Sequence, residues 1–435
     1  MKKLAVVILA AGEGTRMKSA LPKVLHTVAG RPMIEWVLAA TSWLKPAKIV
    51  VVVGNHAQQV KEALGGQPLL ICQQKERLGT AHALKQAAKF FLSFRGDVLV
   101  ICGDTPLVES ATLKQLVAAH RAGNNAATVL SAKAINPFSY GRINRSQSGD
   151  VVGIVEEKDC TAQQRLISEI NSGMYCFSPL MWQALSKIKN NNAKREYYLT
   201  DAISILHAMG KRVDAKMLAS MDEIMGINDR INLADAETIA RKKTLNALMR
   251  AGVTIENPLT TIIGPDITIG ADTVIRSGSI ITGKCSIGAN CEIGPYSVVS
   301  DSAVGDGCKV GPFAHLRPGT VLKTGAKVGN FCEVKKSVVG CCSKVNHLSY
   351  IGDAVLGSDV NIGAGTITCN YDGKNKFKTT IGDRAFVGSN TNFVAPVTVG
   401  AGALIAAGST ITENIPKGML AIARARQINK KRIKS

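Results

Sequence analysis

The chain has 435 residues, of which 46% are hydrophobic and 20% charged, a composition typical of a globular protein with more than one domain. No stretch reaches the roughly 18 consecutive apolar residues that a membrane-spanning helix requires, so we expect no membrane insertion. The formal net charge of +21 favours an acidic partner, either phosphorylated metabolites, anionic lipid or nucleic acid. Aromatic residues make up only 5%, and no basic segment alternates with stacking rings, which argues against nucleic acid.

The eleven cysteines indicate a reducing compartment, because their number is odd and their spacing is not that of a disulfide framework. We therefore expect a cytoplasmic protein. Residues 1–11 imitate a short secretory signal, but the apolar stretch runs directly into a glycine-rich loop, so we interpret it as a first strand. Cys341 and Cys342 lack the spacing of a zinc knuckle and are interpreted as ordinary thiols. The basic ending at residues 430–434 is interpreted as a solvated end of the chain rather than a binding arm.

The first half of the chain alternates apolar strand patterns with helical patterns. Strands are predicted at residues 4–10, 49–53, 69–72 and 97–102, and helices at residues 33–41 and 81–90. This order predicts a Rossmann-like, mostly parallel sheet with helices on both faces, whose ligands bind beyond the carboxyl ends of the strands. A further helical pattern, over residues 230–251, predicts a long connecting helix.

From residue 261 onward an aliphatic residue recurs at every sixth position, and glycine often follows it. The repeat runs from Ile263 to Val299, slips by one residue, resumes at Val304 and continues with further slips to Ile411. A period of six fits neither a helix nor an amphipathic strand, but predicts a parallel β-helix in which each aliphatic side chain points inward. The interval between Thr368 and Ile381 is too long for one repeat, so residues 370–373 are predicted to lie on a protruding loop.

A glycine-rich turn follows the first predicted strand. Its sequence is Leu9-Ala10-Ala11-Gly12-Glu13-Gly14-Thr15-Arg16-Met17, and Pro22-Lys23 comes soon after. Backbone N–H groups of such a turn can approach a phosphate, and Arg16 and Lys23 can neutralise it. The turn lacks the third glycine of the dinucleotide fingerprint and the Gly-Lys-Ser/Thr ending of a Walker A loop.

Cys102-Gly103-Asp104 ends the strand predicted at residues 97–102 with a carboxylate suited to holding Mg²⁺ against a triphosphate. Together with the glycine-rich turn and the segment Gln74–His82, it resembles the sugar-phosphate nucleotidylyltransferases, in which that segment reads uracil. The resemblance implies UTP as a substrate, Mg²⁺ held by Asp104 and Asn228, and Arg16 and Lys23 as catalytic cations. It implies nucleotide and sugar binding by Leu9, Ala10, Ala11, Gly12, Lys23, Gln74, Gly79, Thr80, Cys102, Gly103, Asp104, Gly141, Glu156, Asn171 and Asn228. Cys102 stands where that family has tyrosine, so a ring contact to the sugar or base is expected to be absent.

The second half carries four polar segments, at residues 315–319, 333–336, 346–350 and 361–365. Combined with the β-helix they resemble, over essentially the whole chain, the family of bifunctional N-acetylglucosamine-1-phosphate uridylyltransferases/glucosamine-1-phosphate acetyltransferases. The resemblance implies that His347 is the general base, since an imidazole can take the proton that an amine loses. It also implies glucosamine-phosphate binding by Arg317, Lys335, Tyr350 and Asn361, and acetyl-CoA binding by Ala364, Asn370, Tyr371, Ser389, Ala407 and Arg424. His315 is interpreted as structural or peripheral.

The resemblance implies a uridylyltransferase domain at residues 1–229, a linker helix at residues 230–250 and a left-handed β-helix acetyltransferase domain at residues 251–435. It further implies a homotrimer that shares acetyl sites between its coils and makes UDP-N-acetylglucosamine for peptidoglycan and lipopolysaccharide. Two alternatives stay open. One is a nucleotidylyltransferase whose β-helix serves only trimerisation or regulation, and the other is a basic nucleic-acid-binding scaffold.

Overall fold

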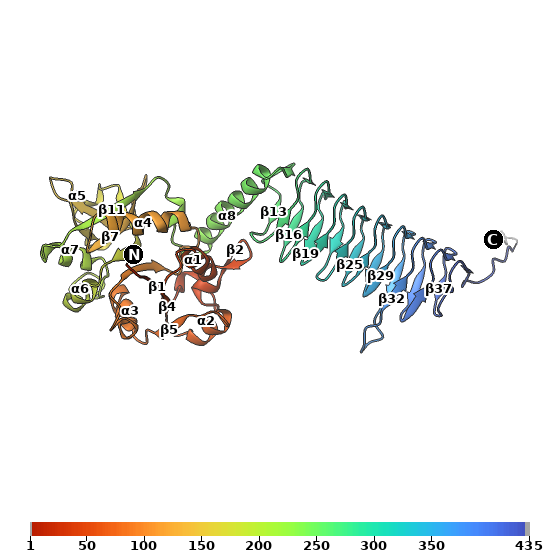
Figure 1. Cartoon of the computed structure of the whole chain (residues 1–435), viewed down its shortest axis with the longest axis horizontal. Helices are drawn as coiled ribbons and strands as arrows, with labels where there is room; N and C mark the ends of the chain where they lie inside the picture. The colour runs from red at the N-terminus through yellow and green to blue at the C-terminus, as the bar shows by residue number, and fades with distance from the viewer. Residues whose placement is uncertain (1, 431–435) are drawn as a thin grey trace, which may run out of the picture. The chain divides into compact units, whose positions relative to one another are not determined.

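The computed structural model describes residues 2–430, so most of the basic ending, residues 431–434, lies outside the described residues (Figure 1). The chain divides into two compact units, Met1–Ala240 and Arg241–Ser435. Within residues 2–430, no helix is both long enough and apolar enough to span a bilayer.

The first unit is built on a nine-stranded sheet. Its main path has the order β11-β7-β10-β6-β1-β4-β5, and β8 and β9 lie off this path. β1 pairs in parallel with β4 and β6, whereas β10 runs antiparallel to β6 and β7, so the predicted mostly parallel sheet is confirmed. The strands are β1 (Leu4–Ala10), β4 (Lys48–Val53), β5 (Leu70–Gln73), β6 (Asp97–Cys102), β7 (Ala127–Lys133), β8 (Arg142–Arg145), β9 (Val151–Val155), β10 (Glu169–Phe177) and β11 (Val213–Leu218).

Helices cover both faces of this sheet. Because successive residues of each strand point to opposite sides, each strand contributes apolar residues to both faces. In β1, Val7 belongs to one apolar cluster with residues of α3, α6 and α7, whereas Ile8 belongs to a second cluster with residues of α1, α2 and α4. These helices are labelled around the strands of the first unit in Figure 1. The predicted helix at residues 81–90 is shorter, because α3 ends at Gln86 and a 3-10 turn follows. The helices are α1 (Met33–Ser42), α2 (Ala57–Ala63), α3 (Thr80–Gln86), α4 (Ser110–Ala122), α5 (Ala162–Arg165), α6 (Met181–Lys187) and α7 (Asp201–Ala208).

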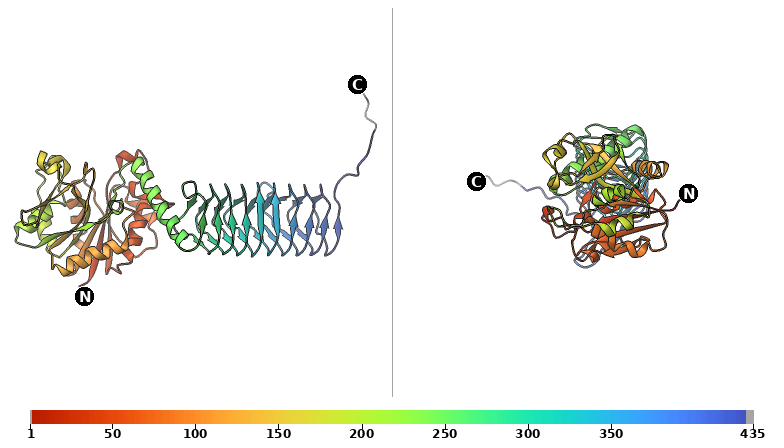
Figure 2. Two further views of the ribbon diagram at one scale, coloured as in Figure 1. Left: turned by 90° about the horizontal axis from the view of Figure 1, so that it is seen from above. Right: turned by 90° about the vertical axis from the view of Figure 1, so that its left-hand side faces the viewer.

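The second unit is a parallel β-helix made of three sheets of ten, nine and eight short strands, from β12 (Thr254–Ile255) to β38 (Leu420–Ala421). The inward position of each repeat is buried, as predicted: Ile275 and Ile293 are in register and have no exposed surface. Figure 2 shows the regular stacking of these strands. The predicted protruding loop lies between β31 (Ile367–Cys369) and β32 (Thr379–Ile381) and is visible beside β32 in Figure 1. A bridge between Tyr371 and Lys376 closes it.

The predicted connecting helix is α8 (Arg230–Arg250). Ala236 and Ala240 pack with Val28 and Met33 in the first unit. Leu245 belongs instead to the apolar core of the β-helix. The helix thus contributes to the cores of both units.

Candidate functional site

The glycine-rich turn and Asp104 lie at the same edge of the first sheet, because they follow the neighbouring parallel strands β1 and β6. Leu9 and Cys102 are in register, and the N–H of Gly103 donates to the carbonyl of Leu9 at 2.9 Å. Gly14 has a φ of +64°, and a Cβ there would come within 2.5 Å of the Lys23 Cβ, so the turn requires glycine. Arg16 follows on an exposed 3-10 turn.

Lys23 contacts both predicted metal ligands. Its side chain is almost buried, and Nζ donates to Asp104 Oδ2 at 2.5 Å and to Asn228 Oδ1 at 2.9 Å. The N–H of Ile227 donates to the Asp104 carbonyl at 3.0 Å, which holds the segment of Asn228 against β6. The side-chain oxygens of Asp104 and Asn228 thus converge on the Lys23 ammonium. Mg²⁺ prefers oxygen ligands, so these two side chains fit this ion.

Among residues 2–430, no group of three or more histidine, cysteine, aspartate and glutamate side chains could hold a metal by itself. Proteins usually bind Mg²⁺ with one or two side chains, while waters and substrate phosphates supply the remaining ligands.

The predicted uracil-reading segment is fixed around Gly79. Gln74 is 4% exposed, and its Nε2 donates to the Gly79 carbonyl at 3.1 Å. Gly79 has a φ of +110°, and a Cβ there would come within 2.5 Å of the Tyr197 carbonyl, so no larger residue fits. Thr80 Oγ1 accepts from the N–H of Leu199 at 2.9 Å. Gln74, Gly79 and Thr80 are therefore brought together in one rigid turn.

The predicted sugar-binding residues form a continuous chain of contacts from Cys102. The Cys102 thiol donates to the Gly173 carbonyl at 3.7 Å, and Asn171 Oδ1 accepts from the Gly173 N–H at 3.0 Å. The N–H of Asn171 donates to the Gly141 carbonyl at 2.8 Å. Burial, reinforced by the charge of Asp104, raises the pKa of Cys102 to about 12, so its side chain is a small neutral thiol.

Glu156 completes this group. An ideal Cβ on Gly141 would lie 3.6 Å from Glu156 Oε2 and 3.6 Å from the Asn171 Cβ, so these three residues are neighbours. Glu156 Oε1 accepts from Thr200 Oγ1 at 3.2 Å. Burial raises the pKa of Glu156 above its usual value.

In the β-helix, His347 is held by a residue that sequence reasoning missed. His347 ends β27 (Lys344–His347) and is in register with Asn330 at the end of β24 (Lys327–Asn330). The distance from His347 Nδ1 to Asn330 Oδ1 is 2.7 Å. With the amide oxygen as acceptor, Nδ1 carries the hydrogen and Nε2 is left to accept a proton. The signal in the sequence was the separation of 17 residues, one coil of the β-helix.

Four of the six predicted acetyl-CoA residues form one row along the β-helix, on the C-terminal side of His347. The register of β27 with β30 (Asn361–Ile362), β33 (Phe386–Val387) and β36 (Leu404–Ile405) places Ala364, Ser389 and Ala407 at successive positions of the same corner. Arg424 ends the row, since its Nη1 donates to the Ala407 carbonyl at 2.7 Å.

Cations gather on the neighbouring sheet of the β-helix. The register of β22 (His315–Leu316) with β25 (Glu333–Lys335) places Arg317 next to Lys335, and Arg317 Nη1 donates to Glu333 Oε1 at 2.7 Å. The pKa of Lys335 is lowered, chiefly by the ammonium of Lys376 on the protruding loop. The charges of these two lysines therefore repel each other, and an anion between them would relieve this repulsion. Sequence reasoning missed Lys376, although a basic residue on a protruding loop was its signal.

The other predicted residues of this site are not all on one face. Tyr350 is in register with Glu333 and shares its sheet, whereas Asn361 belongs to the sheet of His347. On the protruding loop, Asn370 Nδ2 donates to Asp353 Oδ2 at 2.5 Å, and the Tyr371 hydroxyl donates to the Gly373 carbonyl at 2.6 Å. Within one chain, Asn361 therefore lies on a different face from Arg317 and Lys335.

Family models of known proteins match parts of both units of the chain. The family described as MobA-like NTP transferase domain matches residues 6–173, the GMPPB C-terminal domain matches residues 245–328, and the bacterial transferase hexapeptide (six repeats) matches residues 378–413. The hexapeptide match confirms that the β-helix is of the left-handed type.

Relatives match over almost the full length. The chain is 50% identical to the bifunctional protein GlmU of Geobacillus thermodenitrificans, covering 99% of this chain and 97% of that protein. It is 50% identical to the protein of the same name from Staphylococcus haemolyticus, with 98% of each chain covered, and 47% identical to that of Halalkalibacterium halodurans, with 99% and 98% covered. The chain belongs to the GlmU family of bifunctional proteins.

Proposed function

We propose that the chain carries out two successive transfers at two separate sites. The β-helix, residues 251–435, moves the acetyl group of acetyl-CoA to glucosamine-1-phosphate. The first domain, residues 1–229, joins the product to UTP and releases pyrophosphate, and residues 230–250 link the two. The chain is thus a bifunctional transferase of UDP-N-acetylglucosamine synthesis. The observation that carries this proposal is the presence of two independent polar sites, one around Lys23 and Asp104 and one around His347.

In the uridylyl step, an oxygen of the sugar phosphate attacks the α-phosphorus of UTP. The new P–O bond forms as the bond to pyrophosphate breaks, so no protein nucleophile is needed. The N–H groups of the glycine-rich turn, Arg16 and Lys23 stabilise the negative charge of the phosphates. Asp104 and Asn228 would hold Mg²⁺, which when bound supplies further positive charge to the polyphosphate. Orientation of two bound anions in this way can lower a barrier by about 7–11 kcal/mol.

Side chains around these groups orient the two substrates. The rigid turn of Gln74, Gly79 and Thr80 faces the base of the nucleotide. Glu156 and Asn171 bind hydroxyl or amide groups of the sugar. Cys102 occupies little space beside Gly173, so the site lacks the aromatic ring that related nucleotidylyltransferases place there.

In the acetyl step, the amine of glucosamine-1-phosphate attacks the thioester carbonyl. The C–N bond forms and the C–S bond breaks, while His347 Nε2 takes the proton of the amine and returns it to the departing CoA thiolate. A base of this kind contributes about 10²–10⁴-fold to the rate. Arg317, Lys335 and Lys376 hold the sugar phosphate. Asn370 and Tyr371 on the protruding loop are the candidates for contacting the amine and the developing oxyanion.

Acetyl-CoA lies along the row of Ala364, Ser389 and Ala407, whose small side chains leave room for the coenzyme. Arg424 at its end supplies a positive charge for the phosphate groups of CoA.

The homotrimer implied by the family resemblance is also part of the proposal. Tyr296, Phe313 and Phe331 stack in successive coils with ring centroids 5.5 and 5.3 Å apart, and all remain about half exposed. Leu348 continues this column beside His347. An exposed apolar column of this length is typical of a protein contact surface. If another copy of the chain covered this column, its Asn361 would also come close to Arg317 and Lys335 of the first copy.

Sedimentation tests this assembly. The native protein should have about three times the chain mass of 46.0 kDa, and Phe313→Glu should dissociate it and abolish acetyl transfer. The matched control, Leu166→Glu at an exposed position of the first domain, should leave both properties unchanged. A monomeric native protein would contradict the homotrimer.

We place the protein in the cytoplasm, because all eleven of its cysteines are free thiols.

The function itself is tested by mixing the purified protein with glucosamine-1-phosphate, acetyl-CoA, UTP and Mg²⁺. Free thiol and pyrophosphate are followed separately, and both should be released. Pyrophosphate from N-acetylglucosamine-1-phosphate and UTP without any release of thiol from acetyl-CoA would favour a nucleotidylyltransferase whose β-helix only assembles the protein.

A further inference from the structure

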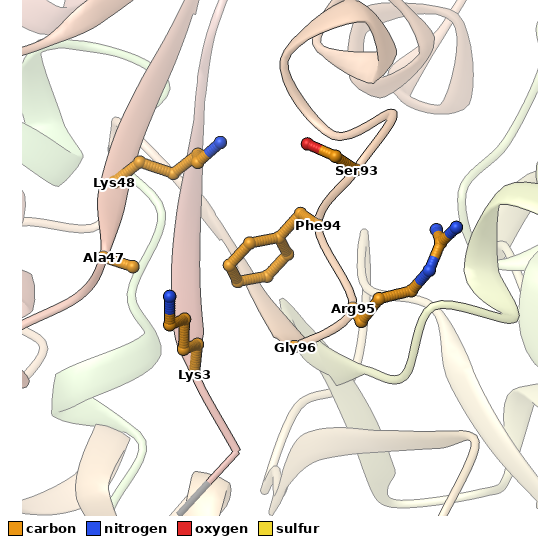
Figure 3. A pocket seen from close by; sticks show the side chains of 7 residues that line it. All are labelled: Lys3, Ala47, Lys48, Ser93, Phe94, Arg95 and Gly96. Carbon is orange, nitrogen blue, oxygen red and sulfur yellow. The ribbon is translucent and has the colours of Figure 1, made fainter.

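The sheet of the first unit carries a basic pocket at the edge opposite to its active-site edge. β1, β4 and β6 run parallel and begin at Leu4, Lys48 and Asp97, so their first residues lie at the end of the sheet away from Asp104. A cavity of about 550 Å³ opens there (Figure 3). Its lining residues are Lys3, Ala47, Lys48, Ser93, Phe94, Arg95 and Gly96.

The walls of this pocket are held by backbone contacts. The N–H of Asp97 donates to the Lys3 carbonyl at 3.0 Å. Gly96 lies so close that a Cβ on it would come within 2.2 Å of that carbonyl and 2.7 Å of the Phe94 ring. Only glycine lets the β1 backbone and the Phe94 ring approach each other in this way. The floor of the pocket is therefore fixed.

Lys48 is positioned rather than left to move in solvent. Its Nζ donates to the Phe90 carbonyl at 2.9 Å and lies 5.6 and 5.4 Å from the ring centroids of Phe91 and Phe94. Because an ammonium has three N–H groups, two remain for a ligand. Figure 3 shows Lys3 and Lys48 on one side of the Phe94 ring and Ser93 and Arg95 on the other.

The positive charge of the pocket is not compensated by its own residues. None of the seven lining residues is acidic. The neighbouring carboxylate of Asp97 is 1% exposed and already accepts a hydrogen bond from Arg121 Nε at 2.8 Å. The adjoining pocket is lined by apolar and basic residues and by no acidic one; its further cations are Lys2, Lys45, Lys114 and Arg121.

We propose that this pocket is a second anion site, which binds a small molecule carrying two or more linked phosphate groups. Lys3, Lys48 and Arg95 contact the phosphates, and Phe94 packs against the ring or apolar part of the ligand. Phosphate oxygens only accept hydrogen bonds and are ionised, which matches side chains that offer donors and positive charge. The volume lies within the range of small-molecule sites. The position at the opposite edge of the sheet makes the site independent of the uridylyl site.

Calorimetric titration with inorganic tripolyphosphate tests the proposal. The full chain is titrated in EDTA with excess UDP-N-acetylglucosamine, N-acetylglucosamine-1-phosphate and CoA, which occupy the proposed substrate sites. The variant Lys3→Ala/Lys48→Ala/Arg95→Ala is compared with Lys61→Ala/Lys187→Ala/Lys189→Ala, which removes three exposed lysine charges elsewhere in the same unit. Both variants keep every other anion site, so the comparison does not depend on the proposed function. Lys3→Gln/Arg95→Gln, which changes only exposed side chains, replaces the triple variant if that protein does not fold.

We expect the native protein to bind one tripolyphosphate per chain. The affinity should fall by about tenfold or more in the pocket variant and stay unchanged in the control variant. Both transferase activities should be unaffected in both variants. Equal binding by both variants, or no binding beyond the substrate-blocked sites, overturns the proposal. Binding to phosphatidylglycerol vesicles that depends on these residues, without binding of free tripolyphosphate, also overturns it, because the surface would then recognise a membrane.

Discussion

The hydrogen bond between Asn330 and His347 allows the acetyl mechanism to be tested by one substitution. Asn330→Ala removes the acceptor 2.7 Å from His347 Nδ1, so the ring loses the partner that keeps Nε2 free for the amine proton. When His347 takes that proton it becomes an imidazolium, and a hydrogen bond to a charged group contributes about 1.5–3 kcal/mol. At about 1.4 kcal/mol per factor of ten, the loss corresponds to roughly 10-fold to 100-fold in kcat, toward the lower figure because the pair is exposed.

The assay follows CoA thiol release at saturating glucosamine-1-phosphate and acetyl-CoA, with pyrophosphate release as an internal control for folding. kcat of acetyl transfer should fall while KM for the sugar stays close to the native value, because Asn330 is not among the residues proposed to touch the sugar. Asn330→Asp keeps an oxygen acceptor at the same place and should restore most of the rate. An Asn330→Ala protein that acetylates with the native kcat would refute the orienting role.

Three further outcomes follow from the same structure. Lys376→Ala removes a cation beside Lys335, so KM for glucosamine-1-phosphate in acetyl transfer should rise by about tenfold or more. Uridylyl transfer should be unchanged. An unchanged KM would exclude Lys376 from the phosphate site. Burial lowers the pKa of His120 to about 4, against an ordinary value of 6.5. The unfolded chain therefore binds more protons between these pH values, and the free energy of unfolding should decrease by up to about 3 kcal/mol as pH falls from 6.5 to 4. Urea unfolding at several pH values should show a shallower decrease for His120→Gln, and identical slopes would contradict this. Ile281→Ala, which empties an inward position with no exposed surface, should cost about 2–5 kcal/mol of unfolding free energy, and Ile280→Ala, which changes its outward neighbour, should cost clearly less. Equal losses in denaturant unfolding would contradict the inward register.

The sequence predicted the β-helix well because one rule, an inward aliphatic residue every six positions, is repeated along the whole unit. Each slip in the pattern corresponds to a shorter coil, as between Ile293 and Val310, which are in register although only 17 residues apart. Of the nine strands in the main sheet of the first unit, β1, β4, β5 and β6 were predicted, because their apolar residues form short continuous runs, as expected for a sheet buried on both faces.

Side-chain partners were harder to predict because they depend on three-dimensional register. Asn330 reaches His347 only because their coil has 17 residues, and Lys376 reaches Lys335 only because the protruding loop folds back. The contact of Lys23 with Asn228 joins residues 205 positions apart, which no local pattern reveals. The family resemblance supplied candidate residues for both sites, and the structure adds their contacts.

The central claim is that two chemically independent transfers occur on one chain, and it is tested most directly by measuring both products in two variants. Asp104→Ala should lose pyrophosphate release by at least about 100-fold and keep native thiol release, whereas His347→Ala should lose thiol release by about 10²–10⁴-fold and keep native pyrophosphate release from N-acetylglucosamine-1-phosphate and UTP. If either variant lost both activities while remaining folded and fully assembled, or lost neither, the assignment of the two sites would be wrong.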